Sequence, residues 1–334
     1  MNDTELEKTK RFVILGAGSI GSVFGGMLAR AGHHVSLVGR GPQMETVRAR
    51  GLIIDGLLGD YVIDSLETFT DLSGIKREPS VTAVFVSVKS SDTADAVQDL
   101  ARSGLVGDNT LVISLQNGLG NLELIHEAFG PERSFGGRVI FGAQLTGPGH
   151  VHVSVWADKV LIGGPGTVTG KKTGQELATL LTGCGIQTEA VDNIEAALWG
   201  KVLYNVGLNP LSALLDVPYG ELGREENAKR LLIQLIEEAF AVAIKEVKLP
   251  WNSVDEYLVH FFGKLLPSTE SHLSSMLQDL DRGRETEIDA ITGQVIRRAD
   301  LLGLPVPVNR VVYELVKAMV AVKKHSPPLP VSGV

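Results

Sequence analysis

The sequence feature that most constrains the fold is a glycine pattern placed directly after a short β-rich run. The run Arg11–Leu15 (RFVIL) leads into Gly-Ala-Gly-Ser-Ile-Gly at 16–21, and residues 19–31 then have helical periodicity. Residues 34–38 have the character of a second strand. The pattern G-x-G-x-x-G between a strand and a helix is the fingerprint of a dinucleotide-binding βαβ unit. We therefore predict an α/β fold that begins with a Rossmann domain, a doubly wound sheet.

The three glycines of the pattern have separate physical roles in such a unit. Gly16 permits a tight turn, Gly18 lets the backbone approach a pyrophosphate, and Gly21 lets helix and strand pack closely. The pyrophosphate then lies at the helix N-terminus, where free backbone N–H groups point at it. The residues predicted to bind the dinucleotide here are Gly16, Gly18, Ser19, Ile20 and Gly21.

The end of the second strand bears on which dinucleotide is bound. NAD-binding units place an acidic residue about 20 residues into the motif, against the ribose 2′-hydroxyl. Here the strand ends in Gly39-Arg40, and no Asp or Glu follows until Glu45. An arginine at this point can pair with a 2′-phosphate, which a carboxylate would repel. The sequence favours NADP(H) with Arg40 as a ligand, and a solvated loop arginine is the alternative.

Two further buried runs supply candidate residues at the same edge of the sheet. The run over residues 81–88 is followed directly by Lys89. The run over residues 110–114 is followed, after Leu115, by Gln116-Asn117-Gly118. The carboxyl ends of parallel strands face the cofactor crevice of a doubly wound sheet. Lys89 is therefore a candidate cofactor ligand, with a surface lysine as the alternative. Asn117 is a candidate near the nicotinamide end, although Asn-Gly is also an ordinary turn signal.

The rest of the N-terminal half is predicted from alternation and turn signals. Residues 51–63 suggest a small β-hairpin insertion, and residues 135–162 suggest antiparallel strands that close the sheet of this domain. A helix over 171–181 and a strand over 186–191 lead to the linker. The predicted division is a tail at 1–10, the Rossmann domain at 11–192, an all-helical domain at 193–325 and a second tail at 326–334.

The helical half begins with an unusual helix over residues 199–216. Lys201, Asn205 and Asn209 recur every four residues, so they form one slowly drifting stripe on a helix that is otherwise mostly apolar. An ordinary surface helix has a broad charged face, so the narrow stripe favours a cleft over bulk water. A snorkelling lysine with incidental asparagines is the alternative. The pair Asn209-Pro210 also predicts a kink or a helix junction.

A later segment predicts a helix with an acidic first turn. Thr286 to Asp289 fits a capping box, which would place Glu287 in the first turn of a helix over 288–302. The helix dipole stabilises a carboxylate there, so Glu287 has a structural explanation of its own. Periodicity alone does not separate Glu287 from Glu285.

Composition argues against several classes of function. The formal net charge of −8 argues against non-specific binding to nucleic acid or to an anionic membrane, which requires clustered Lys and Arg. No apolar run approaches the roughly 18–20 residues that cross a bilayer. The single cysteine, Cys184, fits a reducing compartment, and we expect a cytoplasmic enzyme. The histidines lack metal-ligand spacing, so no metal site is predicted.

Five sequence blocks taken together resemble ketopantoate reductase (2-dehydropantoate 2-reductase). They are GAGSIG at 16–21, VK at 88–89, QNG at 116–118, W-x-K-x3-N-x3-N-P-L at 199–211, and S-S-M-x-Q-D…T-E-I-D-x-I-x-G at 274–293. The blocks lie over nearly the whole chain in the order of that family, and the last two are the most specific. The resemblance implies a Rossmann domain followed by an all-helical domain, with the cleft between them. It also implies NADPH-dependent reduction of 2-dehydropantoate to (R)-pantoate, a step toward pantothenate and coenzyme A.

Matched motif by motif, the resemblance implies a role for each site residue. Lys201 would be the catalytic lysine, the general acid at the ketone oxygen. Asn205 and Asn209 would hydrogen-bond oxygens of the 2-oxo acid substrate, and Ser275 would bind its carboxylate. Glu287 would help to position substrate and cofactor. NADPH would be held by Gly16, Gly18, Gly21, Arg40 and Lys89, with Asn117 at the joint substrate and nicotinamide site.

Other classes of protein stay open at this point. A paralogue that reduces another 2-oxo acid would carry the same lysine and asparagines, and β-hydroxyacid dehydrogenases also pair a Rossmann domain with a helical one. A catalytically silent NADP(H) sensor that binds partners is a further alternative, although an intact set of Lys201, Asn205 and Glu287 is unexpected in a sensor. The oligomeric state is also open, with a homodimer through the helical domain as one alternative.

Overall fold

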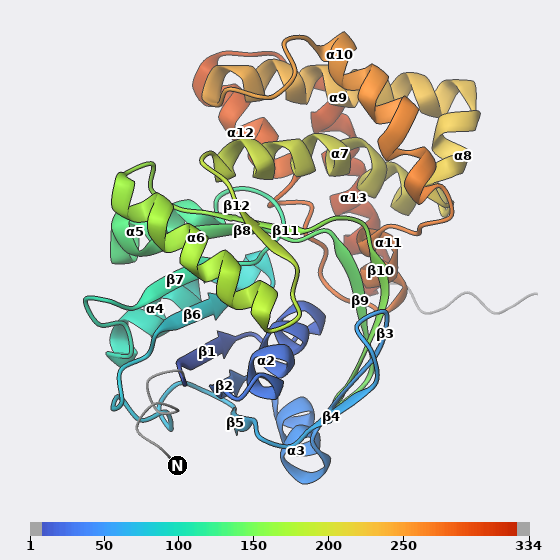
Figure 1. Ribbon diagram of the computed structural model, residues 1–334. Helices are drawn as coiled ribbons and strands as arrows, with labels where there is room; N and C mark the ends of the chain where they lie inside the picture. The colour runs from blue at the N-terminus through green and yellow to red at the C-terminus, as the bar shows by residue number, and fades with distance from the viewer. Residues whose placement is uncertain (1–8, 326–334) are drawn as a thin grey trace, which may run out of the picture. The chain divides into compact units, whose positions relative to one another are not determined.

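The structure, a computed structural model, describes residues 9–325, with the side chains of residues 323–325 left out. The two predicted tails therefore lie almost entirely outside the described residues. The chain divides into two compact units between Ala197 and Leu198, close to the boundary predicted after residue 192 (Figure 1). The first unit is built on β-sheets covered by helices, and the second consists of helices.

The first unit contains the predicted doubly wound sheet. Its strand order is β12-β11-β8-β7-β6-β1-β2-β5. The strands from β5 across to β8 pair in parallel, β11 pairs antiparallel with β8, and β12 pairs in parallel with β11. The bounds are β1 (Arg11–Leu15), β2 (His34–Val38), β5 (Glu67–Phe69), β6 (Ala83–Val86), β7 (Leu111–Ser114), β8 (Ser134–Arg138), β11 (Val160–Gly163) and β12 (Thr188–Ala190).

Helices bury both faces of this sheet. Along β1 the side chains of Phe12 and Ile14 point to one face and those of Val13 and Leu15 to the other, and all four are nearly inaccessible. The helices on the first face are α2 (Ser19–Arg30), α3 (Gly41–Arg50) and α6 (Val168–Gly183). Those on the second face are α4 (Thr93–Ser103) and α5 (Asn121–Phe129), with the short turns η1 (Ser90–Asp92) and η2 (Pro131–Arg133) nearby. The continuous apolar character of these strands follows from this two-sided burial.

A second, smaller sheet covers α2 on the side away from the main sheet. Its order is β4-β3-β10-β9, with bounds β3 (Leu52–Gly56), β4 (Tyr61–Ile63), β9 (Phe141–Gly147) and β10 (His150–Trp156). The predicted hairpin over 51–63 is confirmed as β3 and β4, which pair antiparallel. A Cβ on Gly26 of α2 would lie 2.6 Å from Ile54 Cδ1, so the small sheet lies very close to that helix.

The prediction that all strands over 135–162 close the main sheet was wrong for β9 and β10. Only β8 and β11 join that sheet, whereas β9 and β10 belong to the small one. The physical reason is one-sided burial: Val151 and Val153 of β10 are fully buried, while His150 and His152 are partly exposed on the other face. A strand inside the main sheet has to be apolar on both faces.

The second unit is all-helical throughout the part that the structure describes, as predicted. Its helices are α7 (Ile194–Leu215), α8 (Tyr219–Arg224), α9 (Glu226–Glu246), α10 (Val254–His260), α11 (Ser275–Asp281), α12 (Thr292–Leu302) and α13 (Pro307–His325). Two short turns, η3 (Phe261–Leu265) and η4 (Pro267–Thr269), follow α10. The first residues of α7 precede the division between the units, so a continuous helix links them.

Helix α7 is largely buried, with Val202, Leu203 and Val206 at 1% exposure or less. A Cβ on Gly207 would lie 2.2 Å from Leu232 Cδ1, so a side chain of α9 packs directly onto the α7 backbone at this glycine. The prediction at Pro210 was a kink or a helix junction. The helix continues through Pro210 to Leu215, so there is no junction, and the kink stays a prediction. Proline removes one backbone hydrogen bond, but Leu208 and Leu211 beside it are almost completely buried. Their burial outweighs the lost bond.

Candidate active site

The turn between β1 and α2 is held tightly against the end of the neighbouring strand β6. Gly16 has a φ of +114°, and a Cβ built on it would lie 2.5 Å from the backbone nitrogen of Val88. A Cβ on Gly21 would lie 1.9 Å from the carbonyl oxygen of Gly16. Ser87 Oγ donates a 2.7 Å hydrogen bond to the same carbonyl oxygen. The tight turn and the close packing expected at Gly16 and Gly21 are both present.

Gly18 differs from these two glycines because it faces open space. A Cβ built on Gly18 would have no atom within 4 Å, and Gly18 is the N-cap of α2, where no side chain caps the first turn. Ser19 Oγ accepts a 3.1 Å hydrogen bond from the N–H of Leu145, and Ile20 packs against the sheet core. The N–H groups at a helix N-terminus suit a phosphate, and Gly18 leaves room for one.

A buried hydrogen-bond network joins the loop after β6 to the loop after β7. Gln116 Nε2 donates to Thr93 Oγ1 at 2.6 Å, and Thr93 Oγ1 donates to Asn121 Oδ1 at 2.8 Å. Asn121 Nδ2 donates to the carbonyl oxygen of Asn117 at 3.0 Å. Because Gln116, Thr93 and Asn121 are all buried, the network fixes the loops that carry Lys89 and Asn117 relative to each other.

Arg40 and Lys89 lie after the two strands that flank β1 in the sheet. Arg40 follows β2 and is the N-cap of α3, and Lys89 follows β6 and is the N-cap of η1. The Arg40 side chain is 92% exposed, and its Nη2 lies 4.0 Å from Asp92 Oδ2 of the loop after β6. Lys89 is partly buried. Both predicted cofactor ligands therefore lie at the edge of the sheet that holds the glycine turn.

In the second unit, the predicted polar stripe on α7 is largely buried. Lys201 is half-buried, Asn205 is 7% exposed and Asn209 is 2% exposed. Within residues 9–325 the Asn205 amide has no hydrogen-bond partner, and its oxygen and nitrogen are not fully enclosed. Because these two atoms are reachable from outside, water can bond to the Asn205 amide when no ligand is bound. A ligand with acceptor or donor oxygens could take the place of that water at the Asn205 amide.

Asn209 is held by a tyrosine that the sequence analysis did not single out. Tyr219 Oη donates a 2.7 Å hydrogen bond to Asn209 Oδ1. Tyr219 is 3% exposed, and its ring centroid lies 6.0 Å from that of Tyr204 and 5.4 Å from that of His272. Burial raises the pKa of the Tyr219 phenol well above its ordinary value, so the phenol keeps its proton at neutral pH.

Ser275 lies near the C-terminal end of α7, at the start of α11. Ser274 Oγ caps α11 by accepting a 3.0 Å hydrogen bond from the N–H of Leu277. The N–H of Ser274 donates to Ser212 Oγ at 3.4 Å, and Ser275 itself is exposed. Ser212 lies about one turn of α7 after Asn209. The structure therefore brings Ser275 and Asn209 into the same region of the second unit.

Glu287 does not lie in the first turn of a helix, so the capping-box prediction was wrong. Helix α12 begins only at Thr292, and its N-cap, Ile291, makes no side-chain cap. The N–H groups of Ala290 and Ile291 both donate to the carbonyl oxygen of Glu287, which makes a single separate turn. Ile291 has φ −100° and ψ −87°, a non-helical conformation that separates this turn from α12. Ile288 is 1% exposed and packs in a cluster with the end of α7, which anchors the half-buried Glu287 near that helix.

A second anchor of α7 was also missed. Trp199 is 2% exposed, and its Nε1 donates a 3.3 Å hydrogen bond to Glu246 Oε2 of α9. Arg298 Nη1 of α12 lies 3.2 Å from the same oxygen. A buried indole N–H needs an acceptor, so the sequence indicates that Trp199 has a partner. It does not show which residue that is, because the acceptor lies 47 residues away. This contact holds α7 two residues before Lys201.

Comparisons with known proteins bear directly on this arrangement. The family model "Ketopantoate reductase PanE/ApbA" matches residues 12–165, and the model "Ketopantoate reductase PanE/ApbA C terminal" matches residues 193–320. A 2-dehydropantoate 2-reductase from Aquifex aeolicus is 37% identical over 311 residues, which cover 92% of this chain and 96% of that relative. The chain belongs to the ketopantoate reductase family. The resemblance found in the sequence is thereby confirmed.

Solved structures extend the ketopantoate reductase fold to nearly the whole chain. A PanE/ApbA family ketopantoate reductase from Ralstonia eutropha JMP134 is 34% identical with a TM-score of 0.83, over 94% of this chain and 100% of that one. A ternary structure of D-mandelate dehydrogenase with NADH and anilino(oxo)acetate is 27% identical with a TM-score of 0.84, over 95% of this chain and 100% of that one. The predicted fold class, an α/β domain followed by helices, is that of the ketopantoate reductases.

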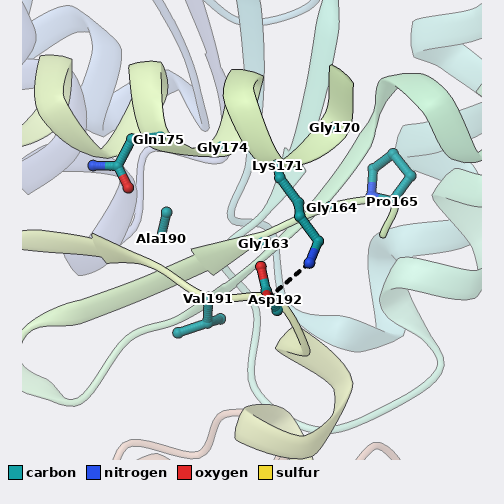
Figure 2. Close-up of a pocket in the computed structure, with 10 residues that line it drawn as sticks. All are labelled: Gly163, Gly164, Pro165, Gly170, Lys171, Gly174, Gln175, Ala190, Val191 and Asp192. Atoms are coloured by element: carbon teal, nitrogen blue, oxygen red, sulfur yellow. Dashed lines mark hydrogen bonds and ion pairs between the residues drawn. The ribbon is translucent and has the colours of Figure 1, made fainter. Parts of the chain in front are cut away.

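A small cavity elsewhere in the first unit contains none of the predicted site residues. It has a volume of about 150 Å³ and lies between the glycine-rich end of β11 and the first turns of α6 (Figure 2). Lys171 Nζ lies 2.8 Å from Asp192 Oδ2 at its rim, and Figure 2 shows the two side chains pointing toward each other.

Three further findings concern residues 9–325. No three His, Cys, Asp or Glu side chains in this range come together as a metal site. No helix in the same range combines the length and apolar character that membrane crossing requires. Cys184, the single cysteine, is buried, and burial raises the pKa of its thiol.

Proposed function

We propose that this chain is an NADPH-dependent 2-dehydropantoate 2-reductase, which reduces the ketone of 2-dehydropantoate to the hydroxyl of (R)-pantoate. Its membership of the ketopantoate reductase family supports the type of reaction. The observation that carries the proposal is the pair of buried amides on α7. Asn205 has no partner for its amide within the described residues, and the Asn209 nitrogen has no acceptor there. Polar donors in a row beside Lys201 suit a molecule rich in acceptor oxygens, such as a 2-oxo carboxylate.

The first unit fits a nicotinamide dinucleotide. The open space at Gly18 and the N-terminus of α2 suit the pyrophosphate, and Ser19, Ile20 and Gly21 form the turn around it. When bound, the reduced nicotinamide supplies the hydride. NADP(H) is the form we propose, because Arg40 presents an exposed guanidinium after β2 and no acidic residue precedes Glu45 there. Lys89 would add a second cation on the other side of β1.

Lys201 is the proton donor in this proposal. Reduction of a ketone develops negative charge on its oxygen, and an ammonium group at that oxygen stabilises the charge and then supplies the proton. Asn205 and Asn209 would donate hydrogen bonds to oxygens of the 2-oxo acid and hold it in one orientation. Donors that are already in place cost no reorganisation when the charge develops. Hydroxyl donation from Ser275 would then bind the substrate carboxylate.

Two residues would connect the substrate to the cofactor. Glu287 would position both, and its place next to the anchored Ile288 limits its freedom. Asn117 would line the joint substrate and nicotinamide site, and the buried network behind it fixes its loop. A cytoplasmic location and a homodimer remain predictions from the sequence.

A second candidate function is the reduction of a different 2-oxo acid. The observation in its favour is the similarity to D-mandelate dehydrogenase, whose structure contains NADH and anilino(oxo)acetate. An oxoacetate is itself a 2-oxo carboxylate, and it carries an aromatic substituent in place of the branched chain of 2-dehydropantoate. The same lysine and amides would serve both substrates, so the residues around the substituent decide between them.

The test is oxidation of NADPH and NADH across a panel of 2-oxo acids. The panel contains 2-dehydropantoate, 2-oxoisovalerate and phenylglyoxylate. We expect the highest kcat/KM with 2-dehydropantoate and NADPH. Lys201→Ala should lower kcat by about 100-fold or more, the usual scale of general acid catalysis, while NADPH still binds. Near-normal turnover by Lys201→Ala would refute the role of the lysine, and a preference for phenylglyoxylate would favour the second candidate.

A further inference from the structure

Tyr219 is fixed in place on several sides. Its backbone N–H donates to the backbone carbonyl oxygen of His272 at 3.0 Å. The N–H of Gly220 donates to the backbone carbonyl oxygen of Glu270 at 2.8 Å. Its ring packs edge-on against Tyr204, with an interplanar angle of 83°. Since the side chain is 3% exposed, the position of its hydroxyl is determined by the fold and not by solvent. This hydroxyl lies 2.7 Å from Asn209 Oδ1.

The direction of this hydrogen bond follows from the needs of the buried phenol. The phenol proton has one acceptor among the described residues, which is Asn209 Oδ1. If the Asn209 amide were turned over, its NH2 group would face the phenol and the phenol proton would have no acceptor. A buried donor left without an acceptor is strongly unfavourable. The Asn209 oxygen therefore faces Tyr219, and the nitrogen faces away.

We propose that Tyr219 is a positioning residue that turns the Asn209 amide so that its nitrogen donates to a carboxylate or ketone oxygen of the substrate. The inference rests on the proposed reduction of a 2-oxo acid. With its oxygen facing Tyr219, Asn209 presents its N–H groups to a ligand. A 2-oxo acid presents three acceptor oxygens, whereas a group that can only donate, such as an ammonium, would meet an N–H group at the same point. Tyr219 thus selects acceptors at this position without touching the substrate.

The experiment compares Tyr219→Phe with a matched control, Tyr204→Phe. Both variants remove one phenol hydroxyl from the same aromatic cluster, in which Tyr219 is buried and Tyr204 is partly buried. The Tyr204 hydroxyl bonds to Thr269 at 2.6 Å and not to Asn209. Steady-state kinetics with 2-dehydropantoate at saturating NADPH should show kcat/KM about 10-fold lower for Tyr219→Phe, or about 1.4 kcal/mol. Tyr204→Phe should stay within about 2-fold of the wild type, and the KM for NADPH should be unchanged in both.

A double-mutant cycle separates positioning from a general structural effect. In an Asn209→Ala background, Tyr219→Phe should change kcat/KM by less than about 2-fold, because the amide that it orients is gone. A loss of folding would lower activity in both backgrounds. If Tyr219→Phe fails to fold, Asn209→Asp serves instead, since its carboxylate still accepts from Tyr219 but has no N–H to offer. We expect Asn209→Asp to lower kcat/KM by about 100-fold or more.

Several outcomes would overturn the inference. They are wild-type kinetics for Tyr219→Phe, equal losses for the two tyrosine variants, losses that multiply in the Asn209→Ala background, or near-wild-type activity of Asn209→Asp. The failure of the proposed function looks different, because the wild-type chain would then reduce no 2-oxo acid at all.

Discussion

Replacing Gly18 by alanine should remove most of the dinucleotide affinity and leave the fold intact. Gly18 has φ −73° and ψ −169°, an extended conformation that alanine adopts readily, and a Cβ there meets no atom within 4 Å. Alanine is a poorer N-cap than glycine, but it also restricts the unfolded chain, so the two effects largely cancel. We expect the free energy of unfolding to change by less than about 1 kcal/mol.

Gly21→Ala is the matched contrast, because its cost falls on the protein itself. The added Cβ would lie 1.9 Å from Gly16 O and 2.4 Å from Ser87 Oγ, so the backbone of the turn has to move. Overpacking of this kind costs about 1–3 kcal/mol. At about 2–4 °C per kcal/mol for a unit of this size, we expect Tm to fall by roughly 2–12 °C without any ligand.

Thermal unfolding with and without NADPH measures both effects. At a ligand concentration of about 100 times Kd, binding stabilises the wild type by about 2.7 kcal/mol, or roughly 5–10 °C in Tm. If Gly18→Ala weakens Kd about 100-fold, the same NADPH concentration adds only about 0.4 kcal/mol. A full Tm shift in Gly18→Ala, or a loss of ligand-free stability as large as that of Gly21→Ala, would refute the reasoning.

Two further predictions concern charge. Arg40→Ala should raise the KM for NADPH about 10-fold and leave the KM for NADH nearly unchanged, because only NADPH has the 2′-phosphate. Equal changes in the KM of both cofactors in steady-state assays would contradict this. Burial lowers the pKa of His272, because the folded chain disfavours the charged imidazolium. The contribution of His272 to the free energy of unfolding is therefore fully present above its unfolded pKa of about 6.5, and it is lost as pH falls through its lower pKa in the folded chain. His272→Asn should therefore show a smaller fall in urea-unfolding stability between about pH 7 and pH 5 than the wild type, and an unchanged pH dependence would argue against His272 as the source.

The parts of the fold that depend on local sequence were predictable. The run Arg11–Leu15 and the glycines after it specify strand, turn and helix within about twenty residues, so β1 and α2 could be placed closely. The stripe of Lys201, Asn205 and Asn209 was likewise visible from helical period alone. Its partial burial agrees with the inverted polarity of α7.

The features that were missed depend on contacts between distant residues. The partner of Asn209 is Tyr219, ten residues on and beyond the end of α7, and no periodic pattern links the two. Glu287 fits a capping box in sequence, but non-helical backbone at Ile291 starts α12 later. Strands β9 and β10 alternate as expected, yet only the partner strand β3 shows which sheet they join.

The hydrogen bond from the Leu145 N–H to Ser19 Oγ has a kinetic consequence for how the chain matures. It joins residues that are 126 positions apart, and the parallel pairing of β3 with β10 likewise brings distant segments together. Such non-local contacts form slowly, because the entropy of closing a long loop is lost before the contact contributes. During refolding, the helical signal in circular dichroism should therefore recover before NADPH binding, which is followed by the change in NADPH fluorescence. A nick in the loop between β9 and β10 should slow the second step selectively.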